Sequence, residues 1–286
     1  MRIKRTFVCF CLLSLSIFFT HAVLAESTLI LGVHPYKQAT EISKSFTPLV
    51  KYLSDKTNRS FKLKISKNYQ THIDLIGNDQ VHIAYMGPAS YIKLVENYGK
   101  KRLLSRLEIN GKPTFQGVII TRQDSDISAL KLLQNKRFAF GSPSSTMSHL
   151  VPRYMLFDAG IPVSALEKYA FLGNHVNVAL GVLTGNYDAG AVKEAIYKKY
   201  KEKGLKALAT TVPLSEHLFI ASDNIDNKFV IKLREIMLEL NLQSNGPDIL
   251  KSIKKTTTAL VAVRDSDYDN LRKMMETLQH LDPALN

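Results

Sequence analysis

Two kinds of apolar spacing alternate along the first third of the chain. Residues 28–33 form a short apolar run typical of a buried strand, and residues 41–56 repeat apolar side chains every three or four positions, which predicts a helix. Lysines alternate with apolar residues over 61–65, which predicts a half-exposed strand. A helix over 69–76 and a strand over 81–85 follow. The order βαβαβ is typical of a doubly wound, mostly parallel sheet.

The same alternation begins again in the second half of the chain. A helix over 89–97 is followed by an apolar run over 116–121, which we interpret as the crossing into a second domain. Residues 217–221 predict the return crossing. Beyond these crossings, we expect strands at 137–140, 169–172, 187–192 and 205–209, and helices up to about 158 and over 176–184, 227–241 and 266–281. Two α/β units joined by two crossings place a cleft between them.

The first 25 residues have the layout of a secretory signal peptide. Three basic residues precede an apolar run over 7–19, and Val23 and Ala25 place cleavage before Glu26. The alternative is a membrane anchor, but about 20 apolar residues are needed to span a bilayer and this run is shorter. We therefore expect residues 1–25 to be removed, with the first lobe at 26–118, the second at 119–214, and the return crossing and C-terminal part of the first lobe at 215–286.

Composition narrows the chemistry of the exported chain. Cys9 and Cys11 both lie inside the predicted signal peptide, which excludes disulfides, thiolate metal sites and cysteine nucleophiles from the mature protein. The signal peptide carries three of the 13 net positive charges and leaves 10. These charges are dispersed, which favours attraction of small anions. The chain has no tryptophan and no basic cluster interleaved with aromatic residues, so we expect no nucleic-acid partner.

Residues 138–149 carry the strongest chemical signal. An apolar strand end and a Gly-Ser-Pro turn lead to three hydroxyl residues, Ser144, Ser145 and Thr146, at the start of a predicted helix. Because the first turn of a helix has unpaired N–H groups and the positive end of the macrodipole, it is suited to an anion. The alternative is an ordinary hydroxyl helix cap. His149 either contacts the anion or fixes this loop from behind.

Other candidates follow predicted strands. Ligands of such sheets bind beyond the carboxyl ends of strands, where Tyr36 and Tyr85 are expected. Both could equally be core aromatics. His175, in the turn Gly173-Asn174-His175, either donates to an oxyanion or caps the helix that follows.

Residues 28 to about 270 resemble the periplasmic binding proteins of phosphate, phosphite and phosphonate ABC transporters, of the phosphonate-binding-protein type. The resemblance rests on the segments 81–91, 140–146, 149–152, 173–175 and 187–192. It implies an α/β protein with the two-lobed type II periplasmic-binding-protein fold, in which two doubly wound mixed sheets are joined by two crossover segments. Such a protein closes on an oxyanion.

The resemblance also implies roles for individual residues. Ser145, Thr146 and His175 would hold the phosphorus-bound oxygens, and Tyr36 and Tyr85 would close over the ligand.

The chain departs from its relatives at several such positions. Met147 stands where many relatives have a further serine. Where relatives that bind an aminoalkyl phosphonate have carboxylates, this chain has Ala195, with Glu194 beside it, and His217, and Val176 replaces a frequent acid. A cationic tail would find few partners, which favours a small oxyanion or one with an uncharged tail.

An enzyme and a metal site are the other interpretations that these residues suggest. Ser145, with His149 or His175 and Asp188, could form a nucleophilic triad, but the chain lacks a Gly-x-Ser-x-Gly elbow. The histidines have no carboxylate cluster at metal-ligand spacing. We therefore expect no enzyme, no metal and no cofactor, but a monomeric periplasmic protein that delivers its ligand to a membrane ABC permease. The alternative is a sensing module that presents its closed form to a membrane receptor.

Overall fold

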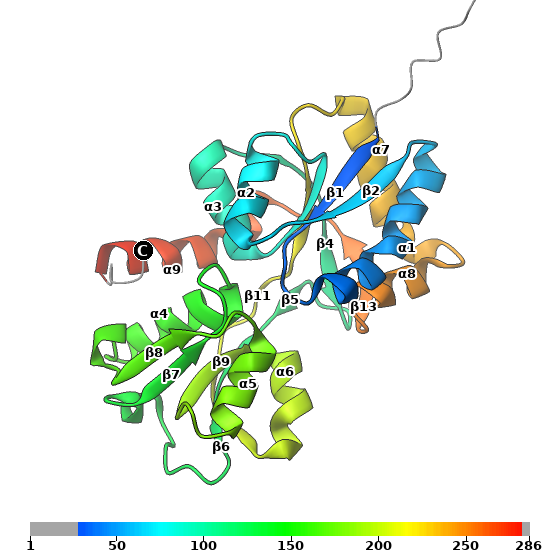
Figure 1. Ribbon diagram of the computed structural model, residues 1–286. Coiled ribbons are helices and arrows are strands. Elements are labelled where there is room, and N and C mark those ends of the chain that lie inside the picture. Colours follow the sequence, from blue (N-terminus) through cyan, green and yellow to red (C-terminus); the bar gives the residue numbers. More distant parts are fainter. Residues whose placement is uncertain (1–27, 282–286) are drawn as a thin grey trace, which may run out of the picture.

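The structure is a computed structural model that describes residues 28–281. It has two lobes, each built around its own mixed sheet (Figure 1). The predicted signal peptide lies outside the described residues. Between residues 28 and 281, no helix is both long and apolar enough to cross a membrane.

The first lobe contains a six-stranded sheet in the order β13-β4-β12-β3-β1-β2. Its strands are β1 (Leu29–Val33), β2 (Phe61–Ile65), β3 (Ile83–Met86), β4 (Arg102–Ile109), β12 (Leu218–Ala221) and β13 (Thr257–Val261). The helices of this part are α1 (Ala39–Thr57), α2 (Tyr69–Gly77), α3 (Pro88–Tyr98), α7 (Asn227–Leu238), α8 (Gly246–Ile253) and α9 (Asp269–Leu281). Strand β1 pairs in parallel with β2 and β3, which confirms the predicted βαβαβ unit.

The second lobe contains a five-stranded sheet in the order β10-β6-β9-β7-β8. Its strands are β6 (Gly117–Arg122), β7 (Arg137–Phe140), β8 (Lys168–Phe171), β9 (Ala189–Lys193) and β10 (Leu205–Thr210). Its helices are α4 (Val151–Asp158), α5 (His175–Leu183) and α6 (Glu194–Tyr200). Strand β7 pairs in parallel with both β8 and β9, so the carboxyl ends of these three strands share one edge.

Two short strands connect the lobes. The outgoing chain passes through β5 (Thr114–Phe115) and the returning chain through β11 (Leu214–Ser215), and the two pair antiparallel. The run at 116–121, expected to be the first crossing, mostly forms β6 of the second sheet. The run at 217–221, expected to be the return, contains β12, which pairs with β3 and β4 inside the first sheet.

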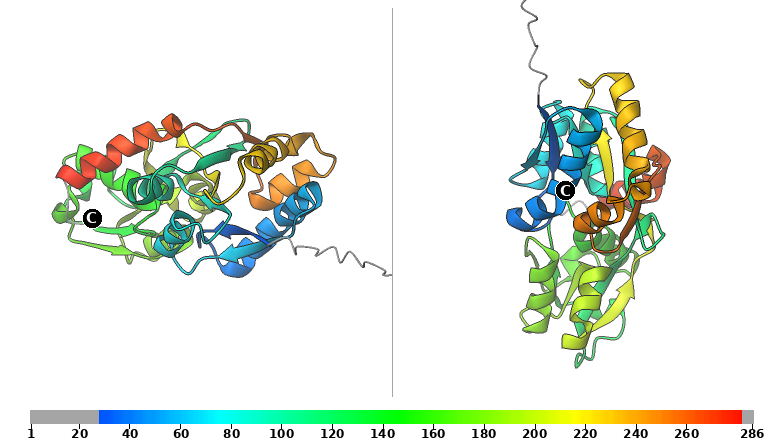
Figure 2. Two further views of the ribbon diagram at one scale, coloured as in Figure 1. Left: turned by 90° about the horizontal axis from the view of Figure 1, so that it is seen from above. Right: turned by 90° about the vertical axis from the view of Figure 1, so that its right-hand side faces the viewer.

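The two lobes are in contact beside the connecting strands. One apolar cluster joins Met147 and Val151 of the second lobe to Ala89 and Tyr91 of the first. Helix α9 packs against both α3 and α4, one helix from each lobe. The right-hand view of Figure 2 shows the lobes stacked along the long axis of the molecule. The structure therefore describes a conformation in which the lobes touch.

Candidate functional site

The parallel strands of both sheets end beside the contact between the lobes. After each of them the chain soon starts a helix, so that the starts of α2, α3, α5 and α6 all face one small cavity. We call this space the cage; its volume is about 40 Å³. It is lined by His34, Tyr36, Tyr69, Gly87, Phe115, Ser144, Ser145, Thr146, Met147, His175, Lys193 and His217. Helix N-termini carry positive partial charge, so this convergence favours a bound anion.

The hydroxyl-rich loop enters the cage through an unusually wide turn. A π-helical turn, Thr146–Leu150, precedes α4, and the N–H of Leu150 donates to the carbonyl of Ser145, five residues back. Pro152 has no N–H to donate to the carbonyl of Ser148, which accepts a hydrogen bond from Gly141 instead, at 3.0 Å. Such turns are frequent at functional sites. Here the turn points the hydroxyl residues into the cage.

Ser145 and Thr146 each use an oxygen lone pair within the protein. Ser145 Oγ accepts a hydrogen bond from the N–H of Ser148 at 3.2 Å, which caps the turn. Thr146 Oγ1 accepts from the N–H of Ala89, at the start of α3 in the other lobe, at 3.1 Å. Because each hydroxyl accepts from a backbone group, its own O–H remains available to donate. The two hydroxyls can thus each donate a hydrogen bond into the cage.

His175 is the first residue of α5, whose N-cap is Asn174. Its Nδ1 accepts a hydrogen bond from the backbone N–H of Lys193 at 3.1 Å. Burial, with a smaller contribution from the charge of Lys193, holds the pKa of His175 well below its usual value. A neutral ring whose Nδ1 accepts must carry its proton on Nε2. His175 is therefore a neutral N–H donor in the wall of the cage.

Histidines and tyrosines of the first lobe form the opposite wall. The Nδ1–H of His34 and the Nε2–H of His72 both donate to the carbonyl of Tyr85, at 3.2 and 3.1 Å. Burial lowers the pKa of both histidines, to about 4 for His72. The ring of His34 lies 5.0 Å from each of the rings of Tyr36 and Tyr69. This wall is aromatic and uncharged, which suits a ligand with an apolar end.

His217 is held by a buried carboxylate. Its Nδ1 donates to Glu216 at 2.9 Å, and Lys254 pairs with the same carboxylate at 2.6 Å. Burial alone would raise the pKa of Glu216, but the hydrogen bond from His217 and the charge of Lys254 lower it below its usual range. The charge of Glu216 is thus neutralised behind the cage wall, and His217 presents its other nitrogen toward the start of α3 at Gly87.

The structure brings most of the sequence-predicted site residues together. The predicted residues that line the cage are Tyr36, Ser144, Ser145, Thr146, His175 and His217. Three others lie elsewhere. Tyr85 is 3 % exposed and packs among Phe46, Phe219 and His34, as a core aromatic beneath the cage.

His149 lies behind the hydroxyl loop. Its Nδ1–H donates to the carbonyl of Pro143 at 2.6 Å, and its ring lies edge-on to Phe140 and Phe171. Burial lowers its pKa to about 4. His149 therefore fixes the loop from behind, which is the second of the two alternatives that the sequence left open. Glu194 lies outside the cage on α6, where it pairs with Lys198 at 2.7 Å.

The arrangement does not form a nucleophilic triad. Asp188 accepts hydrogen bonds from the side chain and backbone N–H of Arg137, at 2.8 Å in each case. The hydrogen bond from Arg137 is the main cause of the lowered pKa of Asp188. This carboxylate therefore fixes the start of β7 and orients no histidine.

Sequence reasoning missed several cage residues. Two of them, Gly87 and Lys193, have a common signal, because each ends or directly follows a strand that reaches the cage. Lys193 is the last residue of β9 and the N-cap of α6. Tyr69 starts α2, and Phe115 belongs to the connecting strand β5. Position at a strand end predicts the cage better than residue type does.

Comparison with known sequences identifies similar proteins. A family model described as "ABC transporter, phosphonate, periplasmic substrate-binding protein" matches residues 31–268. The chain is 25 % identical over 273 residues to the phosphate-import protein PhnD of Mycolicibacterium smegmatis, covering 87 % of this chain and 85 % of that protein. It is 22 % identical over 269 residues to a probable ABC transporter phosphite-binding protein, PhnD1, of Prochlorococcus marinus, covering 87 % and 89 %.

Solved structures share the fold. PhnD1 of Prochlorococcus marinus, in complex with methylphosphonate, superposes with a TM-score of 0.79 at 21 % identity, covering 89 % of this chain and 99 % of that one. The periplasmic aliphatic sulphonate-binding protein SsuA of Escherichia coli superposes with a TM-score of 0.62. These similarities confirm the expected two-lobed type II arrangement of two mixed sheets.

Proposed function

The chain belongs to the family of periplasmic substrate-binding proteins of phosphonate ABC transporters, and we propose that its cage binds a small phosphorus oxyanion: methylphosphonate, phosphite or phosphate. Members of this family are binding components of importers, so the chain is a binding protein and not an enzyme. The residues that hold the ligand, and the ligand itself, are the proposal.

The observation that carries the proposal is the convergence of hydrogen-bond donors on one space. Ser145 and Thr146 each accept one hydrogen bond from a backbone N–H group and keep their O–H to donate, and His175 carries its proton on the nitrogen not bonded to Lys193. A tetrahedral oxyanion needs several donors at once, and hydrogen bonds to a charged acceptor are about twice as strong as neutral ones. This donor set matches the oxygens of one phosphorus centre.

The size of the cage restricts the remaining substituent. The cage measures only about 40 Å³, which favours a hydrogen, a hydroxyl or a methyl group as the remaining substituent over a long alkyl chain. Tyr36, Tyr69 and Phe115 give that end an aromatic wall. We therefore favour methylphosphonate and phosphite, with phosphate as the third ligand of the set.

Closure of the lobes connects binding to transport. A ligand that contacts both lobes binds the closed form better and shifts the population toward it. The hydrogen bond from Ala89 to Thr146 joins the lobes directly beside the cage. We propose that the closed monomer is the form that the membrane permease accepts, and that the mature chain starts at Glu26.

Titration calorimetry of the purified mature chain with methylphosphonate, phosphite and phosphate tests this proposal, with sulfate and chloride as control anions. Mass spectrometry of any co-purified ligand should find a phosphorus oxyanion. We expect dissociation constants in the micromolar range or below for at least one of the three and much weaker binding of chloride. No measurable binding of any of the three would refute the proposal.

A further inference from the structure

Lys193 lies where the cage meets two larger cavities, and the proposed function gives it no role. The first, of about 510 Å³, we call the vestibule; it shares Phe115 and Lys193 with the cage. The second, of about 470 Å³, we call the side cavity; it shares Tyr36, His175 and Lys193 with the cage. Lys193 is the residue common to all three spaces. A substituent too long for the cage must pass it in either direction.

The ammonium group of Lys193 is not neutralised by a neighbour. Among the described residues, no carboxylate lies within ion-pair distance of it; Glu194 pairs with Lys198, and Glu216 pairs with Lys254. Its Nζ lies 5.7 Å from the centre of the Tyr36 ring, which places the charge at the cage wall. Burial, together with the charges of Lys254 and Lys37, lowers the pKa of Lys193 to about 8, and the charge of Glu216 opposes this shift only in part. The cation is thus present at neutral pH in surroundings that compensate it only partly.

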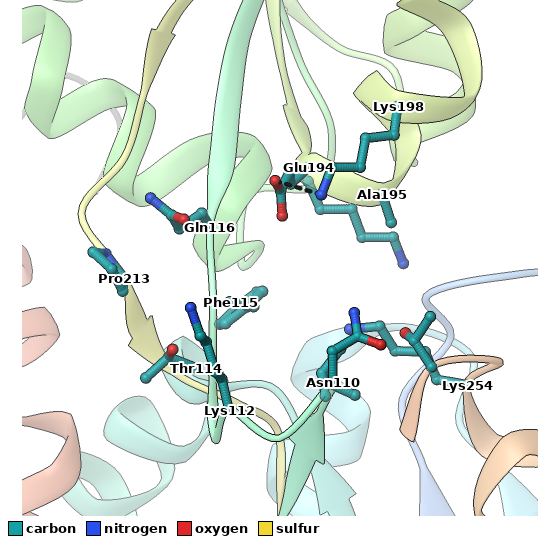
Figure 3. Close-up of a pocket in the computed structure, with 13 residues that line it drawn as sticks. Asn110, Lys112, Thr114, Phe115, Gln116, Glu194, Ala195, Lys198, Pro213 and Lys254 are labelled. Atoms are coloured by element: carbon teal, nitrogen blue, oxygen red, sulfur yellow. Dashed lines mark ion pairs between the residues drawn. The ribbon is translucent and has the colours of Figure 1, made fainter. Parts of the chain in front are cut away.

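The vestibule and the side cavity both carry an excess of lysines beyond Lys193. Figure 3 shows the vestibule, with Glu194 and Lys198 on one side and Asn110, Lys112 and Lys254 on the other. The ion pair of Lys198 with Glu194 leaves no free carboxylate on that wall. The side cavity has Lys37 and Lys199 with one carboxylate, Glu41. A positively charged group leaving the cage would meet net positive charge in either direction.

We propose that Lys193 is the charge-selecting residue of this site: it attracts the oxyanion and excludes phosphonates whose substituent carries an ammonium group. This inference rests on the proposed function and adds a direction of specificity to it. The site thereby takes small anionic phosphorus compounds with a neutral or negative substituent and discriminates against aminoalkyl phosphonates.

The size of the effect follows from Coulomb's law. Two like charges about 6 Å apart, at an effective dielectric constant of about 20, repel by an amount equal to roughly a hundredfold in binding. Solvent in the vestibule reduces this repulsion. We therefore expect the wild-type protein to bind methylphosphonate at least about tenfold more tightly than 2-aminoethylphosphonate.

The test compares these two probes in three proteins by titration calorimetry: wild type, Lys193→Met and Lys131→Met. Lys131→Met is the matched control, because it removes the same formal charge from an exposed position of the same lobe that lines neither the cage nor the two adjoining cavities. Lys193→Met should weaken methylphosphonate binding by about ten- to a hundredfold and bring the ratio between the probes to within about threefold. Lys131→Met should leave both affinities within about twofold.

The outcomes separate the two proposals. If wild type binds none of methylphosphonate, phosphite and phosphate, the proposed function fails and this inference fails with it. If wild type binds methylphosphonate but Lys193→Met retains the wild-type affinity and ratio, or wild type prefers 2-aminoethylphosphonate, only this inference is overturned. Thermal melting guards against a folding defect, and Lys193→Gln provides a second neutral variant. Removing an unpaired, partly buried cation should not lower the melting temperature.

Discussion

Replacing Thr146 by Val tests the hydrogen bond that joins the lobes. Ala89 is 0 % and Thr146 is 6 % exposed, so water cannot take the place of the lost oxygen in the closed form. Val keeps the shape of Thr but leaves the N–H of Ala89 without an acceptor. A buried donor left unsatisfied costs about 1–3 kcal/mol.

That cost applies only when the lobes are closed. In an open form the N–H of Ala89 is accessible to water, so the ligand-free protein should melt within about 2 °C of wild type, which is less than the shift expected from 1 kcal/mol. Affinity for methylphosphonate should fall by at least about fivefold and up to about 150-fold, since each ~1.4 kcal/mol is a factor of ten. Any direct bond from Thr146 to the oxyanion would add to this loss.

Titration calorimetry, thermal melting and small-angle scattering with and without ligand measure these quantities. Thr146→Ser retains the oxygen and should stay within a few-fold of wild-type affinity. Scattering should show that ligand reduces the radius of gyration of wild type and of Thr146→Ser. At the same ligand concentration, the radius of gyration of Thr146→Val should fall less, because part of this variant remains open. Equal affinities of the Val variant and wild type would refute the reasoning, as would an equal loss in the Ser variant.

Four further predictions follow from the cage. Ser145→Ala should weaken oxyanion binding by roughly ten- to a hundredfold in calorimetry, and it should lower the stability measured by melting by about 1 kcal/mol because this hydroxyl also caps the turn. Ser142→Ala, the control, should not change the affinity. If Ser145→Ala lowers only the melting temperature, Ser145 is a helix cap and not a ligand donor. His175 should remain neutral with its proton on Nε2 throughout pH 6–8, because its pKa lies well below its usual value; nitrogen NMR that finds an imidazolium at pH 6 would contradict this. The Kd of the wild-type protein for methylphosphonate should rise above about pH 8, by up to about tenfold per pH unit, because Lys193 loses its proton there. The charged or titratable groups that face Lys193 are Lys37, Lys254, Glu216 and His175. The rise should be absent in Lys193→Met, and a wild-type Kd that does not change with pH would count against this prediction. Asp188→Asn should lower the melting temperature and leave affinity unchanged, because its partner is Arg137; lost binding would be evidence against that assignment.

The sequence predicted the elements whose apolar spacing is regular. The unit β1-α1-β2-α2-β3 and the strands β7 to β10 were expected close to where they lie. Strand β4 (Arg102–Ile109) was missed, because its basic residues interrupt the apolar pattern and its place in the sheet is decided by pairing with β12 and β13. Pairing between segments more than 100 residues apart leaves no local signal.

The sequence also predicted those residues of the candidate site that belong to local motifs. The hydroxyl loop and His175 have local motifs, so the sequence identified them. Whether Tyr36 or Tyr85 lines the cage depends on how the strands pack: Tyr36 lines it, whereas Tyr85 is buried in the core beneath it. Lys193 directly follows the strand predicted at 187–192, but its residue type does not distinguish it from the exposed lysines of α6, and only the tertiary fold places it in the cage wall.

Pro152 does not line the cage, yet it shapes the site before a ligand binds. By withholding an N–H from Ser148, it fixes the wide turn that aims Ser145 and Thr146, and it does so before any ligand arrives. The entropy of shaping this half of the site is therefore lost once, during folding, and not again at each encounter. What remains for each encounter is the swing of two preformed lobes, a motion of microseconds to milliseconds. We therefore expect the motion of the lobes, and not the folding of the hydroxyl-rich loop, to limit capture and release.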